Sequence, residues 1–285
     1  MSIKAYKGFN KDMTCRGFQY EEGKEYETDK AEVCETGFHA CEYPLDCFSY
    51  YSPNVSVYHE VEQDGEISRS DGDSKVASSK IKIGASINIA GIVKAAIEYT
   101  TKRTNKENDA TGDYGASSAT GYKGASSATG YKGASSATGY KGASSATGDY
   151  GASSATGDYG ASSATGDYGA SSATGNYGAS SATGDYGASS ATGYCSVSSA
   201  TGYCSVSSAE CENSIAVAWG YHGKTKGVIG SYLVLADWEG DENNYWTPEL
   251  WSLKGAKMVR VDGKKIKENT FYTMVNGEIE EVEDE

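Results

Sequence analysis

The sequence has no apolar run that approaches the roughly 18 residues of a membrane-spanning helix, and only 38% of its 285 residues are hydrophobic. Its opening, "MSIKAYKGFNKDMTCRGF", places a charge every few residues and lacks the apolar segment of an export signal. We therefore expect a protein that is neither inserted in a membrane nor secreted by a signal peptide, and that works in a cytoplasm.

An excess of positive charge is also missing. The formal net charge is -14, and residues 1–105, 106–213 and 214–285 contribute -4, -5 and -5. Direct binding to nucleic acid needs a basic stripe that neutralises phosphates. The composition therefore argues against it.

Paired cysteine motifs are absent too. The seven cysteines are odd in number and irregular in spacing, which is typical of reduced thiols. Cys34, His39, Cys41 and Cys47 lie close together in the sequence, but without the CxxC spacing of zinc sites. Packed free thiols are favoured over zinc, and we expect no cofactor.

What the sequence does contain is a nine-residue repeat, which keeps its register from Ala110 to about Cys211. The unit "GASSATGDY" (142–150) serves here as the reference for positions one to nine. Position one is occupied in successive units by Gly115, Gly124, Gly133, Gly142, Gly151, Gly160, Gly169, Gly178, Gly187, Ser196 and Ser205. A period kept over about a hundred residues, with a tyrosine in every unit, predicts an ordered solenoid rather than a flexible Gly/Ser linker.

We expect a mainly β protein in which a parallel β-solenoid (106–213) lies between a small α+β domain (1–105) and a β-rich C-terminal cap (214–285). The first part is predicted to have strands at 56–62 and 79–89, a helix at 91–103 and a shorter helix after Pro44. Strands of the cap are predicted at 214–219, 230–238, 255–266 and 270–282, with hairpin turns at "DG" (262–263) and "NG" (276–277). Such a cap would cover the open edge of the last coil.

Within a unit, Ala143–Thr147 is predicted to form a strand and residues 148–151 a turn. Position two becomes Val197 and Val206 near the cap, and position four becomes Val217. Because side chains alternate between the two faces of a strand, we expect positions two and four to face the core. Each position-four serine would then bond a backbone carbonyl or the next serine in the stack.

The number of units in one coil follows from the turns. A closed coil needs at least two turns, and each unit has one clear turn signal, so we expect two units in each 18-residue coil and five to six coils. Cys195 and Cys204 would then lie on opposite edges of the solenoid, whereas a one-unit coil would stack them on adjacent coils.

Positions eight and nine carry the exposed chemistry, because they read Tyr-Lys or Asp-Tyr in most units. We expect tyrosine ladders along the edges, either as a cover for a thin Ala/Ser core or as a binding surface. Calcium is disfavoured because each turn offers at most one carboxylate, and calcium prefers six to eight oxygens. The candidate binding surface consists of Tyr122, Tyr131, Tyr140, Asp149, Tyr150, Asp158, Tyr159, Asp167, Tyr168, Tyr177, Asp185 and Tyr186.

Several stretches resemble known families. The pattern "ATGDYGASS", residues 212–238 and residues 261–283 resemble uncharacterised phage and prophage repeat proteins, which imply no activity. "ENSIAVAWG" (212–220) is similar to the head repeats of trimeric bacterial adhesins, which are parallel β-rolls. "AYKGF" (5–9) and "GFHACEYPLDCFSYY" (37–51) resemble elements of ADP-ribosyltransferases, with Lys7 in place of the first-strand Arg or His and no matching glutamate motif.

These observations favour a non-enzymatic, phage- or prophage-encoded binding or structural protein that uses its solenoid surface, for example as a host-interaction or anti-defence factor. A virion or tail accessory, an adhesin-like protein and an ADP-ribosyltransferase-like enzyme are the alternatives. The expected partner is a host or phage protein or a second copy of the chain, and the expected location is the bacterial cytoplasm or the virion.

Overall fold

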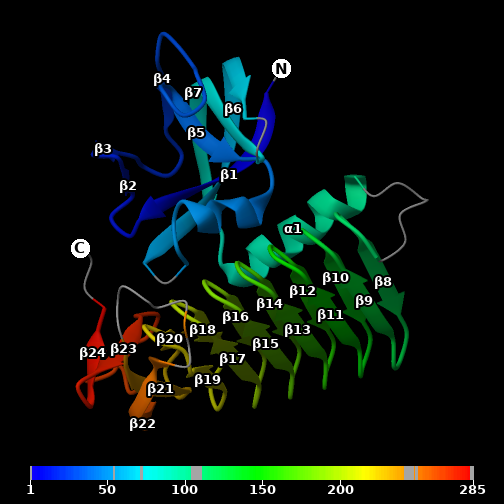
Figure 1. Cartoon of the computed structure of the whole chain (residues 1–285), viewed down its shortest axis with the longest axis vertical. Helices are drawn as coiled ribbons and strands as arrows, with labels where there is room; N and C mark the ends of the chain where they lie inside the picture. Colours follow the sequence, from blue (N-terminus) through cyan, green and yellow to red (C-terminus); the bar gives the residue numbers. More distant parts are fainter. Residues whose placement is uncertain are drawn as a thin grey trace. The chain divides into compact units, whose positions relative to one another are not determined.

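The computed structural model describes residues 2–53, 55–70, 73–103, 111–240, 247 and 250–282. The chain divides into two compact units, Met1–Ala96 and Ile97–Glu283. The predicted fold class is confirmed, since the molecule is mainly β and a parallel β-solenoid lies between an N-terminal β-rich region and C-terminal strands (Figure 1). None of the helices in the described ranges has the length and apolar character needed to span a membrane.

The N-terminal unit is built on a five-stranded antiparallel sheet in the order β4-β7-β5-β1-β6. Its strands are β1 (Ile3–Asn10), β4 (Glu25–Glu27), β5 (Phe38–Cys41), β6 (Ser56–Arg69) and β7 (Lys75–Ser86). Strand β6 pairs with both β1 and β7, so β5, β1, β6 and β7 close on themselves around Phe9, Val61, Val76 and Ile83. The strands predicted at 56–62 and 79–89 lie largely within β6 and β7.

Short elements complete this unit. The hairpin of β2 (Thr14–Cys15) and β3 (Phe18–Gln19) turns at Arg16 and Gly17, both of which have positive φ. The helix expected after Pro44 is the 3-10 helix η1 (Pro44–Ser49), which begins at that proline. The predicted longer helix is α1 (Ile89–Arg103), which begins in this unit and whose residues from Ile97 onward belong to the second unit. At its start the Asn88 side chain accepts a hydrogen bond from the Gly91 N–H.

The solenoid consists of short strands that alternate between two parallel sheets. One sheet contains β8 (Ala116–Thr120), β10 (Ala134–Thr138), β12 (Ala152–Thr156), β14 (Ala170–Thr174), β16 (Ala188–Thr192), β18 (Val206–Ala209) and β20 (Lys224–Gly227). The other contains β9 (Ala125–Thr129), β11 (Ala143–Thr147), β13 (Ala161–Thr165), β15 (Ala179–Thr183), β17 (Val197–Thr201), β19 (Ile215–Ala218) and β21 (Tyr232–Glu239). Each pair of neighbours up to β20 is offset by 18 residues, as in Ala134 opposite Ala152.

Two units therefore make one coil, as predicted, and Cys195 and Cys204 lie in turns on opposite edges.

The solenoid has more coils than the five to six that were predicted. Parallel pairing continues through β19, β20 and β21, within the region predicted to be the cap. The strands predicted for the cap at 214–219 and 230–238 correspond to β19 and β21, and β20 ("KTKG") was not predicted because its lysines obscure the repeat.

The prediction that positions two and four face the core is wrong. Positions three and five are inside: Ser144 is 5% exposed and Ala146 is 0% exposed, whereas Val197 at position two is 41% exposed. The apolar residues that suggested the opposite lie on the outer faces of the two sheets, where Val197 is exposed but Val206, on the sheet that contains β8, is 0% exposed. Inside, position three is serine and position five is alanine in every unit from β8 to β18.

The buried serines bond one another along the solenoid axis. From Ser144 to Ser207, each position-three hydroxyl donates to the serine nine residues earlier, on the opposite sheet, at 2.8–3.0 Å. Serine hydroxyls therefore form hydrogen bonds with one another as expected, but at position three and not at position four. Direct bonds between serines of facing sheets leave no room for large aliphatic side chains in the core.

The C-terminal strands close the solenoid differently at each sheet. Strand β22 (Ser252–Arg260) pairs antiparallel with β21, and β23 (Tyr272–Val275) pairs with β20 and with β24 (Glu278–Glu281). The "NG" hairpin is confirmed, with positive φ at Asn276 and Gly277. The "DG" hairpin prediction is wrong, because β22 and β23 belong to different sheets; the Asp262 carboxylate instead accepts the N–H groups of residues 264, 265 and 266.

Candidate functional site

The turns of the solenoid form two edges, each with one turn per coil. Edge A comprises residues 112–115, 130–133, 148–151, 166–169, 184–187, 202–205 and 220–223, and edge B comprises 121–124, 139–142, 157–160, 175–178, 193–196 and 211–214. The position-seven glycine is required at each turn of the regular coils. A Cβ on Gly166, for example, would lie 2.6 Å from the carbonyl of Gly148 in the preceding coil, and its φ is 127°.

The predicted surface residues are divided between these edges. Tyr131, Asp149, Tyr150, Asp167, Tyr168, Asp185 and Tyr186 lie on edge A, and Tyr122, Tyr140, Asp158, Tyr159 and Tyr177 lie on edge B. The predicted tyrosine ladders are confirmed on both edges. One continuous surface that unites all twelve residues does not form.

Ring geometry in the ladders depends on the position within the unit. Between Tyr122 and Tyr186, rings that occupy the same position in successive coils stack nearly parallel, as for Tyr168 and Tyr186 at 5.2 Å and 4°. Where the tyrosine shifts from position nine to eight, the pair is edge-to-face, as for Tyr177 and Tyr194 at 6.5 Å and 90°. Stacking covers much of the ring faces, so the ladder presents mainly ring edges and hydroxyls.

The two edges differ in how their side chains are covered. Along edge B, Tyr122, Tyr140, Tyr159, Tyr177 and Tyr194 are 43–63% exposed. On edge A, Lys132 is only 2% exposed, its Nζ lies 5.1 Å from the Tyr131 ring centroid, and its carbonyl accepts from the Thr100 hydroxyl. Edge B is therefore the more accessible ladder.

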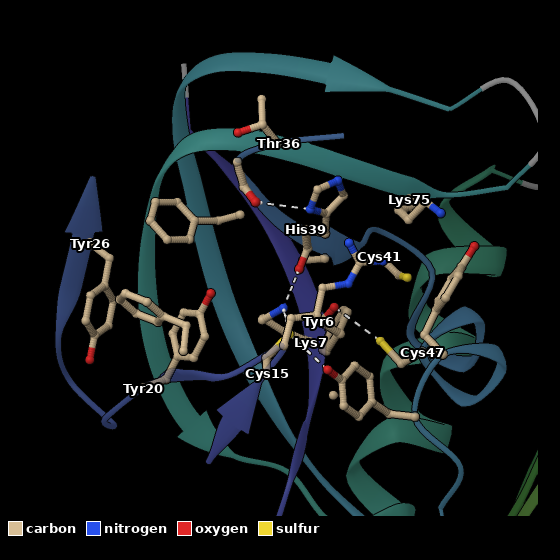
Figure 2. Close-up of a pocket in the computed structure, with 18 of the residues that line it drawn as sticks. Tyr6, Lys7, Cys15, Tyr20, Tyr26, Thr36, His39, Cys41, Cys47 and Lys75 are labelled. Atoms are coloured by element: carbon tan, nitrogen blue, oxygen red, sulfur yellow. Dashed lines mark hydrogen bonds between the residues drawn. The ribbon is translucent and has the colours of Figure 1, made fainter. Parts of the chain in front are cut away.

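A second candidate site is a pocket of about 600 Å³ in the N-terminal unit (Figure 2). Its walls are aromatic, and its cations come from three elements that are separated in the sequence. The aromatic lining residues are Tyr6, Phe18, Tyr20, Tyr26, Phe38, Tyr50 and Tyr51, and the cationic ones are Lys7, Arg16 and Lys75. Two carboxylates, Glu27 and Glu35, also line it.

Lys7 on β1 is the central cation of this pocket. It is only 5% exposed, and its Nζ donates to the carbonyl of His39 at 2.9 Å and to Cys15 Sγ at 3.3 Å. The rings of Phe9 and Tyr20 lie 5.3 and 5.5 Å from it, which favours a positive charge. Among the described residues no carboxylate forms an ion pair with this side chain.

Cys15 and Tyr51 extend this cluster. The Tyr51 hydroxyl donates to Cys15 Sγ at 2.9 Å, so the sulfur accepts from both Tyr51 and Lys7. Burial, and then the hydrogen bond to Cys15, raise the pKa of Tyr51 well above its usual value. Tyr51 therefore remains a protonated donor at neutral pH.

His39 on β5 is held neutral beside the same cluster. The Cys34 N–H donates to Nε2 at 3.0 Å, and Nδ1 lies 3.1 Å from the Gly37 carbonyl, which assigns the proton to Nδ1. Burial lowers the pKa of His39, and the nearby charges of Lys7, Arg16 and Lys75 lower it further. The three cations thus converge on this side of the pocket.

The remaining thiols of the pocket are those of Cys34, Cys41 and Cys47. Cys47 Sγ donates to the Tyr6 carbonyl at 3.2 Å, and a hydrogen bond with Cys47 and burial raise the pKa of Cys41 well above its usual value. Cys34 is exposed. Over the described ranges, no three His, Cys, Asp or Glu side chains are arranged to hold a metal ion.

Residues 3–95, which include every residue that lines this pocket, match the model of a family described as a domain of unknown function, DUF7666. No curated protein and no solved structure matches the chain. The comparison therefore marks the N-terminal domain as a recurring unit and assigns it no chemistry.

Sequence reasoning identified Lys7, His39 and the nearby cysteines, but not the pocket. Cys15 and Tyr51 received no role. The pocket forms because β1 pairs with β5 at Tyr6 and Cys41, which brings residues more than thirty positions apart into contact.

Proposed function

We propose that the chain is a binding protein whose N-terminal domain takes a small organic anion with a planar ring. The observation that carries this proposal is the buried Lys7, whose ammonium lies among aromatic rings in a pocket of about 600 Å³. An anion would place negative charge beside the cations Lys7, Arg16 and Lys75, and exposed rings such as Phe18 would pack on a planar group.

In this proposal the solenoid serves as a rigid stalk. Backbone hydrogen bonds join every coil to the next, and their regularity suits a rod whose length changes by whole coils. The phage or prophage origin inferred from the repeats fits such a display function and is part of the proposal.

Binding is testable by isothermal titration calorimetry of the full chain with AMP, and with adenosine as the uncharged comparison. We expect AMP to bind and adenosine to bind at least about tenfold more weakly, because charge-assisted bonds to Arg16 and Lys75 are lost. The variant Arg16→Gln should weaken AMP binding several-fold, and Lys24→Gln, which removes an exposed cation outside the pocket, should not. Equal binding of both compounds, or of neither, would count against an anion site.

An ADP-ribosyltransferase-like activity is the first alternative, because both stretches that carry that resemblance, 5–9 and 37–51, contribute residues to the pocket, among them Lys7 and His39. NAD⁺ is an anion with planar rings and belongs among the probes. Release of nicotinamide that is lost in Lys7→Met would support the enzyme over simple binding.

The solenoid surface is the second alternative, favoured by the row of exposed tyrosines on edge B. Affinity capture from a bacterial lysate, with the intact chain and with Tyr140, Tyr159 and Tyr177 changed to Ser, tests it. A partner retained equally by both chains would exclude this edge as the binding surface.

A further inference from the structure

Cys15 has surroundings that differ from those of Cys47 and Cys195. It is half-buried, lines the N-terminal pocket, and its sulfur accepts hydrogen bonds from two different side chains. Cys47, by contrast, uses its sulfur as a donor to a carbonyl, and Cys195 lies in a solenoid turn away from this cluster.

Two hydrogen-bond donors converge on this sulfur, one from Lys7 and one from Tyr51. A thiolate accepts hydrogen bonds strongly and a thiol weakly, and one of the two donors here is a buried lysine. Lys7 is held in place by its second bond, to the His39 carbonyl, and the positive φ of Arg16 and Gly17 fixes the turn that follows Cys15. Cationic, partly exposed surroundings of this kind are where reactive cysteines occur.

We propose that Cys15 is a nucleophile that forms a covalent bond with small carbon electrophiles bearing an anionic group. In the reaction with iodoacetate, the thiolate sulfur attacks the CH₂ carbon, an S–C bond forms, the C–I bond breaks, and iodide leaves with the electron pair. Lys7 and Tyr51 act as positioning residues that stabilise the thiolate before attack. The inference shares its pocket with the proposed anion binding but depends on the contacts of the sulfur.

The experiment measures alkylation rates of each cysteine in the full chain at pH 7 by peptide mass spectrometry, with neutral iodoacetamide and anionic iodoacetate in separate reactions. We expect Cys15 to react with iodoacetamide about tenfold faster than Cys195, which is also half-buried. Lys7→Met should lower the Cys15 rate about tenfold, and Tyr51→Phe should lower it several-fold, while the Cys195 rate stays unchanged.

Tyr51→Phe keeps the shape of the ring, so the test does not depend on whether the buried Lys7→Met variant folds. A Cys15 rate no faster than that of Cys195, or one unchanged in Tyr51→Phe, would overturn the inference. The ratio of iodoacetate to iodoacetamide rates should be higher at Cys15 than at Cys195 if the pocket attracts anions. If Cys15 is alkylated faster than Cys195 but shows no preference for iodoacetate, its role as a nucleophile is supported and the anion site is contradicted.

Discussion

At position eight of the repeat, one side chain can accept a hydrogen bond from a backbone N–H in the turn of the next coil. Asp167 Oδ1 accepts the backbone N–H of Asp185 at 2.9 Å, and Asp185 Oδ1 accepts that of Tyr203 at 2.8 Å. Asn176 makes the same bond to the Tyr194 N–H at 3.0 Å. An acceptor at this position can therefore bond the next turn without carrying a negative charge.

Asp185 provides a test of that distinction. Burial raises the pKa of its carboxyl, the Tyr203 N–H opposes this, and the charge of Asp167 raises it again. A raised folded-state pKa means that the folded chain binds the proton more tightly, so stability falls as pH rises above the usual value of 3.8. Asp185→Asn removes the charge and keeps the acceptor.

We expect Asp185→Asn to increase the free energy of unfolding at pH 7 by less than about 1 kcal/mol, and the gain to vanish as pH falls below the usual aspartate pKa. Asp185→Ala, which lacks the acceptor, should lose about 0.5–1.5 kcal/mol at pH 7. Chemical denaturation across pH measures both. A destabilised Asn variant at every pH would show that the charge itself stabilises the turn.

At the scale of one strand, the alternation of side chains was predictable but its direction was not. The sequence reveals five-residue strands and their turns because the glycines and tyrosines keep strict phase. The inside was misassigned because valine and isoleucine, which usually mark a core, lie here at positions two and four, on the outer faces of the sheets. In so thin a solenoid the reverse holds, since the unchanging small residues are inside and variation is tolerated outside.

Strand β13 offers adjacent serines that test this directly. Ser162 is 4% exposed and bonds Ser153 and Ser171, both at 2.9 Å, whereas Ser163 faces outward. Ser162→Val should destabilise the chain by about 1–3 kcal/mol through overpacking. Ser163→Val should change stability by less than about 0.5 kcal/mol, because Val217 occupies the same position in β19 of the same sheet.

Denaturation midpoints of the two variants provide the measurement, since a repeat protein need not unfold in one step. The pair is matched in strand, sheet and substitution. A larger loss for Ser163→Val than for Ser162→Val would restore the original assignment of the core.

At the scale of the whole molecule, the order of the parts and the two-unit coil followed from period and turn signals. The pocket did not, because Lys7, Cys15, His39 and Tyr51 come from separate segments and meet only through the antiparallel pairing of β1 with its neighbours. The period of a repeat gives the sequence separation of the residues that contact one another in adjacent coils. A closed sheet of unlike strands has no such period. The sequence therefore predicts the solenoid better than the pocket domain.

The two-unit coil can be tested with a single new cysteine. Tyr186 is nine residues from Cys195 and eighteen from Cys204, and all three residues have φ of 53–56° at position nine. Equivalent Cα atoms in adjacent coils are about 4.8 Å apart, within the range that a disulfide spans. Oxidised Tyr186→Cys should therefore form a disulfide with Cys204, which peptide mass mapping identifies. A bond to Cys195 would instead mean one unit per coil, and the unchanged chain, with Cys195 and Cys204 on opposite edges, should leave both thiols free.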